Sequence, residues 1–247
     1  MPDSIDVKKH STTQTILFHL FPGLTNLIAI LLLIPLVTGF GFVPVAAGYV
    51  MVPVAMIPVQ LGILLYIAKK NFGTFRITKL IPFREKSKLS EYLLFVVIIV
   101  IWATVILRVL EPLETSLRDG LFSFVPDNIA LRNIDLAAYS KNKLIAVAIF
   151  GLLVNGILAP VMEELYFRGF LLPRINAKFP FFINAVLFSL YHFFAPWNFF
   201  SRLLVMIPVY YWVVKRKNIR FSLIAHLINN IYTGVTILVG VSMLLYC

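Results

Sequence analysis

The chain has 247 residues, of which 60% are hydrophobic, and it carries a formal net charge of +11. This composition excludes an ordinary soluble domain and predicts an all-α protein whose helices cross a membrane several times. The basic residues gather between apolar runs, as the positive-inside rule describes for cytoplasmic loops, so nucleic acid is not an expected partner. The one cysteine, Cys247, excludes a disulfide framework and a cysteine-based metal site.

Seven apolar runs predict seven transmembrane helices, surrounded by membrane lipid. The second run contains Pro44, Pro53 and Pro58 and should be kinked, which membrane helices tolerate. An eighth segment, partial or re-entrant, could lie within residues 111–143. In chain order the predicted spans cover 16–38, 42–68, 92–110, 144–172, 181–194, 201–214 and 221–246.

The charges of the connections predict the orientation of the helices. Residues 69–88 carry seven basic residues and one acidic residue, and residues 215–220 carry four basic residues. The connection 111–143 is balanced, with four basic and five acidic residues. We therefore expect the N-terminus and the basic connections in the cytoplasm and the connection 111–143 outside, in a multi-pass protein of the plasma membrane.

Charged residues interrupt the fourth apolar run. Glu163, Glu164 and Arg168 lie within six residues of one another at its end. Ionisable groups are expensive inside a membrane, so they are candidates for a functional site. Glu164 and Arg168 stand at i and i+4 on a helix and can form a pair, whereas Glu163 projects about 100° away. We expect Glu163 to find its partner on another helix.

Two of the four histidines, His192 and His226, fall inside later apolar runs. Glu163, His192 and His226 lie about 13, 16 and 8 Å from the inner ends of their predicted helices, at roughly 1.5 Å of rise per residue. Asn230 follows His226 by one turn and shares its face. These depths predict that the four side chains meet in one intramembrane cavity that opens to the cytoplasm.

Two chemistries fit these side chains. In the first, Glu163 takes a proton from water, one histidine helps to activate that water, and a histidine and Asn230 donate hydrogen bonds to the oxyanion of an amide undergoing hydrolysis. In the second, Glu163, His192 and His226 bind zinc and leave a fourth position open. We favour the first, without a cofactor, because His226 and Asn230 are placed as neighbouring donors, and zinc stays possible.

Three motifs resemble those of the CAAX-protease and bacteriocin-processing family of intramembrane endopeptidases. They are Glu163-Glu164-x-x-x-Arg168, Phe188-x-x-x-His192 and His226-x-x-x-Asn230, in this order and on successive apolar segments. The resemblance covers about residues 144–240, and the type II CAAX prenyl endopeptidases are the best-known member type. It implies a catalytic helical core over residues 144–247, preceded by N-terminal transmembrane helices and loops over residues 1–143.

The resemblance also implies a role for each motif residue. Glu163 corresponds to the catalytic glutamate, His192 to the histidine that helps to activate water, and His226 with Asn230 to the pair that stabilises the oxyanion, while Glu164 and Arg168 support them. The implied activity is cleavage of a peptide or protein, lipidated in some members, near the cytoplasmic membrane face. The family is often labelled metalloprotease.

Two other functions fit the same residues. A catalytically silent scaffold or bacteriocin-immunity protein would keep this core for its stability alone. A proton-coupled transporter would use Glu163 and the two histidines as a proton relay. Transporters often contain inverted repeats, and we find no convincing repeat in this sequence.

Overall fold

The computed structural model describes residues 7–243, which form helices and no strand. Six helical stretches are long and apolar enough to cross a membrane, and one shorter apolar helix accompanies them. This confirms the predicted all-α polytopic bundle. The expected end of the last span at residue 246, and Cys247, lie outside the described residues. The six long stretches are Thr12–Gly39, Val45–Phe72, Leu89–Leu121, Lys141–Arg174, Pro196–Arg216 and Arg220–Met243.

The elements of the N-terminal part of the chain alternate between long helices and short connecting turns. They are α1 (Thr12–Gly39), α2 (Val45–Met51), the π-helical η1 (Val52–Met56), α3 (Ile57–Phe72), η2 (Ile77–Leu80), α4 (Leu89–Ser116), η3 (Leu117–Leu121), α5 (Asp127–Ala130) and η4 (Leu136–Ala138). The C-terminal part contains α6 (Lys141–Leu153), the π-helical η5 (Val154–Leu158), α7 (Ala159–Glu163), the π-helical η6 (Glu164–Leu171), η7 (Leu172–Arg174), α8 (Pro180–Tyr191), η8 (Pro196–Asn198), α9 (Phe199–Arg216) and α10 (Arg220–Met243).

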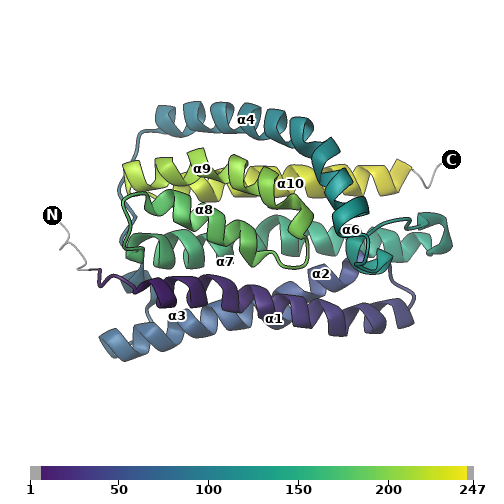
Figure 1. Ribbon diagram of the computed structural model, residues 1–247, viewed down its shortest axis with the longest axis horizontal. Coiled ribbons are helices and arrows are strands. Elements are labelled where there is room, and N and C mark those ends of the chain that lie inside the picture. The colour runs from purple at the N-terminus through teal and green to yellow at the C-terminus, as the bar shows by residue number, and fades with distance from the viewer. Residues whose placement is uncertain (1–6, 244–247) are drawn as a thin grey trace.

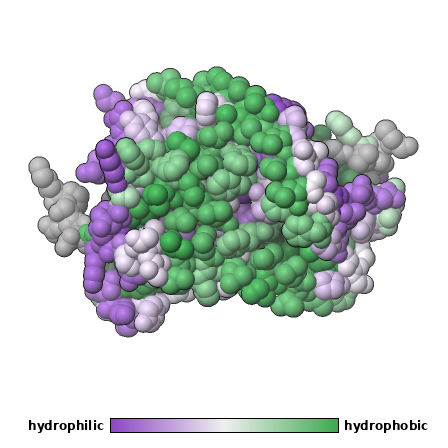
Figure 2. Space-filling model, viewed as in Figure 1, coloured by the Kyte–Doolittle hydropathy of each residue, from purple (hydrophilic) through white to green (hydrophobic). Residues whose placement is uncertain are grey.

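The long helices lie side by side along the longest axis, with α4 at one edge of the bundle and α1 and α3 at the opposite edge (Figure 1). Hydrophobic side chains cover the middle of the visible face, and hydrophilic ones gather at the two ends (Figure 2). Large apolar side chains such as Leu32 and Leu94 are 65% and 62% exposed. Such exposure suits a surface that faces lipid.

Proline explains two of the interruptions in the long helices. Pro53 lies in the π-helical segment η1, where the second predicted span was expected to be kinked. Pro160 follows η5 and cannot donate a backbone hydrogen bond, so the helix widens by one residue before it. Glu163 is therefore the last residue of the short α-helix α7, which lies between two π-helical segments, and Glu164 is the first residue of the second one, η6.

The fifth predicted span is helical over only part of its length. Helix α8 contains 12 residues, which correspond to about 18 Å, whereas a bilayer core is about 30 Å thick. His192 ends the helix with φ −84° and ψ 56°. The chain then turns through η8 and returns along α8 as α9. Besides the end of α4, the described segment 111–143 contains only short helical turns, so it holds no eighth long span.

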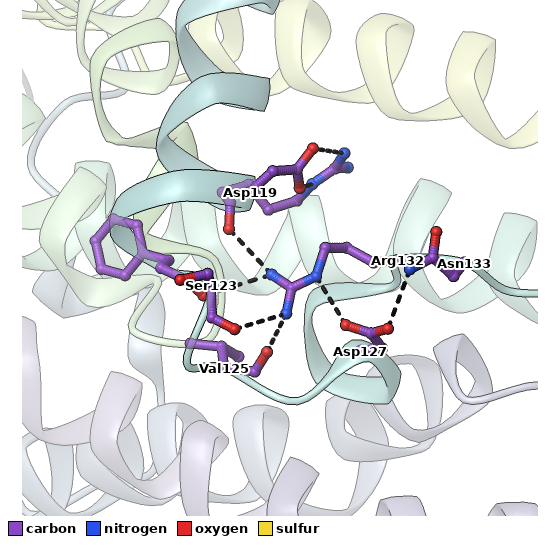
Figure 3. Close-up of polar contacts among 8 residues, drawn as sticks. Asp119, Ser123, Val125, Asp127, Arg132 and Asn133 are labelled. Carbon is purple, nitrogen blue, oxygen red and sulfur yellow. Dashed lines mark hydrogen bonds and ion pairs between the residues drawn. The ribbon is translucent and has the colours of Figure 1, made fainter.

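Arg132 organises the connection between α4 and α6 (Figure 3). Its Nε donates to Asp127 at 2.8 Å, and its other nitrogens donate to four main-chain carbonyl groups. The pKa of Asp127 is lowered, first by the hydrogen bond from Arg132 and then by one from Asn133. Trp197 of η8 packs edge-on against Phe122 in this connection. The connection therefore lies over the turn between α8 and α9.

A glycine lets α1 approach the end of α8. A Cβ atom at Gly23 would collide with the main-chain carbonyl group of Tyr191, so any larger residue would push the two helices apart. Three residues further along α1, Asn26 hydrogen-bonds to the hydroxyl of the same tyrosine. The N-terminal helix is thus held directly against the C-terminal half of the chain.

Candidate active site

The structure brings Glu163 and the two predicted histidines together. Glu163 ends α7, His192 ends α8, and His226 lies in the second turn of α10. His226 Nε2 is 3.7 Å from Glu163 Oε2, and His192 Nε2 is 4.0 Å from Glu163 Oε1. The side chain of Glu163 is 8% exposed. Three helices therefore meet at one carboxylate, as the estimated depths predicted.

The neighbouring Glu164 has a different set of partners. Its Oε1 lies 3.4 Å from Arg168 Nη1 and accepts a hydrogen bond of 2.9 Å from His226 Nδ1. The Arg168 guanidinium is sandwiched between the rings of Phe188 and Tyr210, at 3.9 and 4.0 Å from their centroids. Stacking of this kind favours the charged form of arginine in a buried place. Glu164 thus accepts from Nδ1 of His226, and Nε2 of the same ring faces Glu163.

Hydrogen bonds at Nδ1 orient both imidazole rings. His192 Nδ1 lies 2.8 Å from the carbonyl oxygen of Phe188, which can only accept, so Nδ1 carries the proton. His226 Nδ1 faces the Glu164 carboxylate in the same way. In the neutral rings Nε2 is then the acceptor, and both Nε2 atoms point toward Glu163. A water molecule placed between them and Glu163 could donate one proton to Glu163 and the other to one of the two Nε2 atoms.

These groups line a cavity of about 290 Å³. We call the end of the bundle that carries the basic connections 69–88 and 215–220 the basic end. The cavity extends from Glu163 past residues such as Met51 and Asn198, which lie further from this basic end. Toward the basic end the next side chains, including Tyr166 and Phe167, are completely buried. The predicted opening to the cytoplasm remains a prediction. The polar lining residues are Asn26, Asn155, Glu163, Tyr191, His192, Asn198, Ser201, Arg202, His226, Asn229 and Asn230.

Asn230 lies in the same cavity but already has partners. Its Nδ2 donates to the main-chain carbonyl oxygen of Asn155 at 2.9 Å, and its Oδ1 accepts from Asn229 Nδ2 at 3.3 Å. Asn155 belongs to η5, where the π-helical turn leaves carbonyl groups available to side chains. An amide nitrogen has two hydrogens, so one N–H of Asn230 is left for a ligand.

A second cavity of about 580 Å³ adjoins the first between α4, α9 and α10. Leu107, Met206, His226 and Asn229 line both cavities. Apolar residues of α4, such as Ile99 and Ala103, form much of its wall, and the exposed ion pair between Arg108 and Glu111 lies at its other end. The candidate site is therefore next to a largely apolar space that reaches the surface of the bundle.

The predicted zinc ligands do not form a metal site as they are arranged. A carboxylate and two Nε2 atoms have suitable chemistry, and hydrogen bonds at Nδ1 resemble those behind metal-bound histidines. Ligands about 2.0–2.1 Å from a tetrahedral ion would lie about 3.3 Å apart, closer than the 3.7 and 4.0 Å observed. Among residues 7–243, no group of three or more histidine, cysteine, aspartate or glutamate residues could hold a metal ion. We derive no step through a metal.

Several polar residues of the site were not predicted. Asn26 and Gln60 come from the N-terminal helices α1 and α3, and both contact the hydroxyl of Tyr191. Arg202 of α9 lines the cavity and donates to the Ser189 carbonyl oxygen. Arg202 lies inside an apolar run, so the rule that selected Glu163, an ionisable residue in such a run, would also have selected Arg202. Asn26 and Gln60 also lie inside apolar runs, but their amides are not ionisable and that rule passes over them.

Comparison with known proteins gives one match. Residues 145–232 match the family model for type II CAAX prenyl endopeptidase Rce1-like proteins. This region contains Glu163, His192, His226 and Asn230, and it leaves out α1 to α4. No curated protein and no solved structure matches the chain. The protein is thus a multi-pass helical membrane protein, and its residues 145–232 match the Rce1-like family model, as its three motifs predicted.

Proposed function

We propose that the chain is an intramembrane endopeptidase in which Glu163 activates a water molecule for attack on a peptide bond. The observation that carries this proposal is the convergence of two oriented imidazole rings on one carboxylate at the wall of a polar cavity. The Rce1-like domain supports the same reaction class. A buried base next to a cavity is the arrangement that general-base hydrolysis requires.

In the proposed reaction, water donates one proton to Glu163 and attacks the carbonyl carbon of the scissile bond. His192 Nε2 accepts from the same water and fixes its position, because its Nδ1 is tied to the Phe188 carbonyl group. Glu163 later passes the proton to the leaving amine. The carboxylate is thus first a base and then an acid, and it returns to its starting form.

Donors for the oxyanion come from α10. The free N–H of Asn230 is one donor, and His226 is a second when Nε2 carries a proton. A proton on each His226 nitrogen has a carboxylate acceptor, since Glu164 lies at Nδ1 and Glu163 at Nε2. Preorganised donors of this kind stabilise the charge that develops on the carbonyl oxygen.

The substrate would be a membrane-embedded peptide or protein. The cavity of about 290 Å³ is at the small end of ligand sites and accommodates only the residues around the scissile bond. The adjoining apolar cavity could take a hydrophobic part of the same substrate, including a lipid group. Cleavage near the cytoplasmic face is part of this proposal, because the positive-inside rule favours a cytoplasmic location for the end of the bundle that carries the basic connections.

The test is cleavage by the purified protein in lipid vesicles, using a library of fluorogenic peptides with and without a lipid group. Wild type should cleave some of these peptides, and Glu163→Gln should not. Glu85→Gln is the matched control, because Glu85 is exposed and pairs only with Lys217 at 3.8 Å. Equal cleavage by wild type and Glu163→Gln would disprove the proposal. No cleavage by wild type would favour a silent scaffold.

A further inference from the structure

Tyr191 is the residue next to His192 and is almost completely buried, with 1% of its surface exposed. Its ring packs against Phe167 and His192, with centroids 4.8 Å away in both cases. Tyr191 lines the same cavity as Glu163. No motif of the sequence includes this tyrosine, and the proposed reaction does not use it.

Two amide groups from the N-terminal helices approach the hydroxyl. Asn26 Nδ2 donates to it at 2.7 Å and Gln60 Nε2 donates to it at 3.1 Å. All three side chains are buried. A phenolic oxygen that accepts from two amides has its acceptor capacity filled, so its remaining role is to donate its own proton.

The candidate acceptor for that proton is Glu163. Both residues line the same cavity, and Tyr191 precedes His192, whose Nε2 lies 4.0 Å from Glu163 Oε1. The charge of Glu163 also acts on the Tyr191 hydroxyl. A hydrogen bond to a carboxylate is stronger than one to a neutral amide oxygen, so the proton points to Glu163 and both amides turn their nitrogens to Tyr191. The oxygens of Asn26 and Gln60 then point away, and both are buried without a hydrogen-bond partner among residues 7–243. Two buried amide oxygens without such a partner are an energetic cost of this orientation.

We infer that Tyr191 is a positioning residue for the catalytic base, and that Asn26 and Gln60 orient it. In this arrangement the Tyr191 hydroxyl donates to the Glu163 carboxylate, which the Nε2 atoms of His192 and His226 also approach. Asn26 and Gln60 lie on α1 and α3, outside the residues that match the family model. The N-terminal helices therefore take part in setting the geometry of the reaction. This inference rests on the proposed function only for its effect on turnover.

The first experiment compares Tyr191→Phe with Tyr210→Phe. Tyr210 is also completely buried, and its hydroxyl has no hydrogen-bond partner in the described part of the chain, so its loss removes the same atom without breaking a bond seen there. Tyr191→Phe should lower kcat by about 10–100-fold with KM little changed, because one charge-assisted bond to the base is lost. Tyr210→Phe should keep the wild-type kcat. Gln60→Met should lower kcat in the same direction as Tyr191→Phe, and by less. Equal kcat for both tyrosine variants would overturn the inference.

The second experiment does not depend on activity. The melting temperatures of Tyr191→Phe, Glu163→Ala and the double variant form a cycle that measures the coupling between the two side chains. The shift of the double variant should be smaller than the sum of the single shifts, because the second substitution removes a bond already lost. Glu163→Met, which keeps the length of the side chain and has no oxygen acceptor, replaces Glu163→Ala if the latter does not fold. Additive shifts would refute the contact, even if Glu163 proved essential for cleavage.

Discussion

The two adjacent glutamates divide the bundle into two different environments. Around Glu164 the structure is solid: Arg168, His226 and stacked aromatic rings surround a carboxylate that is 1% exposed. Around Glu163 the structure is hollow, and its carboxylate faces a polar cavity. One step along the chain thus separates a carboxylate enclosed in an ion pair from a carboxylate that lines a cavity. Helix geometry produces this separation, because successive residues project about 100° apart.

The strongest test of this comparison replaces the group on the hollow side. Glu163→Gln should abolish proteolysis and leave the melting temperature close to wild type, because it removes the base and keeps the shape of the side chain. Initial cleavage rates and thermal unfolding in detergent would measure the two quantities. A large fall in melting temperature for Glu163→Gln would place Glu163 with the structural group instead.

The next test changes the closely packed surroundings of Glu164. Glu164→Ala should lower the free energy of unfolding by about 3–5 kcal/mol, because Arg168 would stay buried without its carboxylate. It would also free His226 Nδ1, so turnover should fall as well. Denaturant titration of the purified protein measures the stability. A Glu164→Ala variant that is inactive yet as stable as wild type would exchange the roles of the two glutamates.

Asn230 of α10 lines the same cavity as Glu163. Asn230→Ala should lower turnover by about 10²–10³, the usual loss for one oxyanion donor. The same substitution breaks its bond to the Asn155 carbonyl group, so thermal unfolding must be followed in parallel. Asn229→Ala is the control for removing an amide from this cavity, since Asn229 lines the cavity and donates to Asn230 but takes no part in the bond to Asn155. Equal losses of turnover in both variants would argue against an oxyanion donor at residue 230.

Metal analysis sharpens the comparison further. If Glu163 activates water without a metal ion, the purified active protein should keep its activity after prolonged treatment with a strong chelator. If zinc is needed, activity should fall and should recover on adding zinc, and His226→Ala should release the ion. Stoichiometric zinc in the active wild-type protein would show that the residues close around a metal by less than 1 Å from their present separations.

The smallest expected effect lies at the basic end. His10 packs against Phe18 and Phe170, and burial, followed by the charge of Arg174, lowers its pKa to about 4. The unfolded chain therefore binds a proton at higher pH than the folded protein does, and stability should fall as the pH drops from about 6.5 toward 4. Melting temperatures across this range should decrease less in His10→Phe than in wild type. Parallel curves would exclude His10 as the cause.

The sequence was sufficient to predict the bundle and the meeting of Glu163, His192 and His226. Apolar runs report membrane helices, and residue counts from their ends report depth, so side chains at similar depth could be grouped. The sequence was insufficient for features that depend on how helices end and which faces meet. The apolar composition of 181–194 continues past His192, although the helix does not, and nothing local connects Asn26 with Tyr191.

The close approach at Gly23 limits how the protein can be recombined. Residues 145–232 form the matched region, and an engineer seeking a new specificity would exchange that region between relatives. The Tyr191 carbonyl group, however, needs a residue without a Cβ atom opposite it on α1. Chimaeras should therefore retain activity only when the donor of α8 and the donor of α1 are the same protein, or when α1 keeps glycine and asparagine three residues apart.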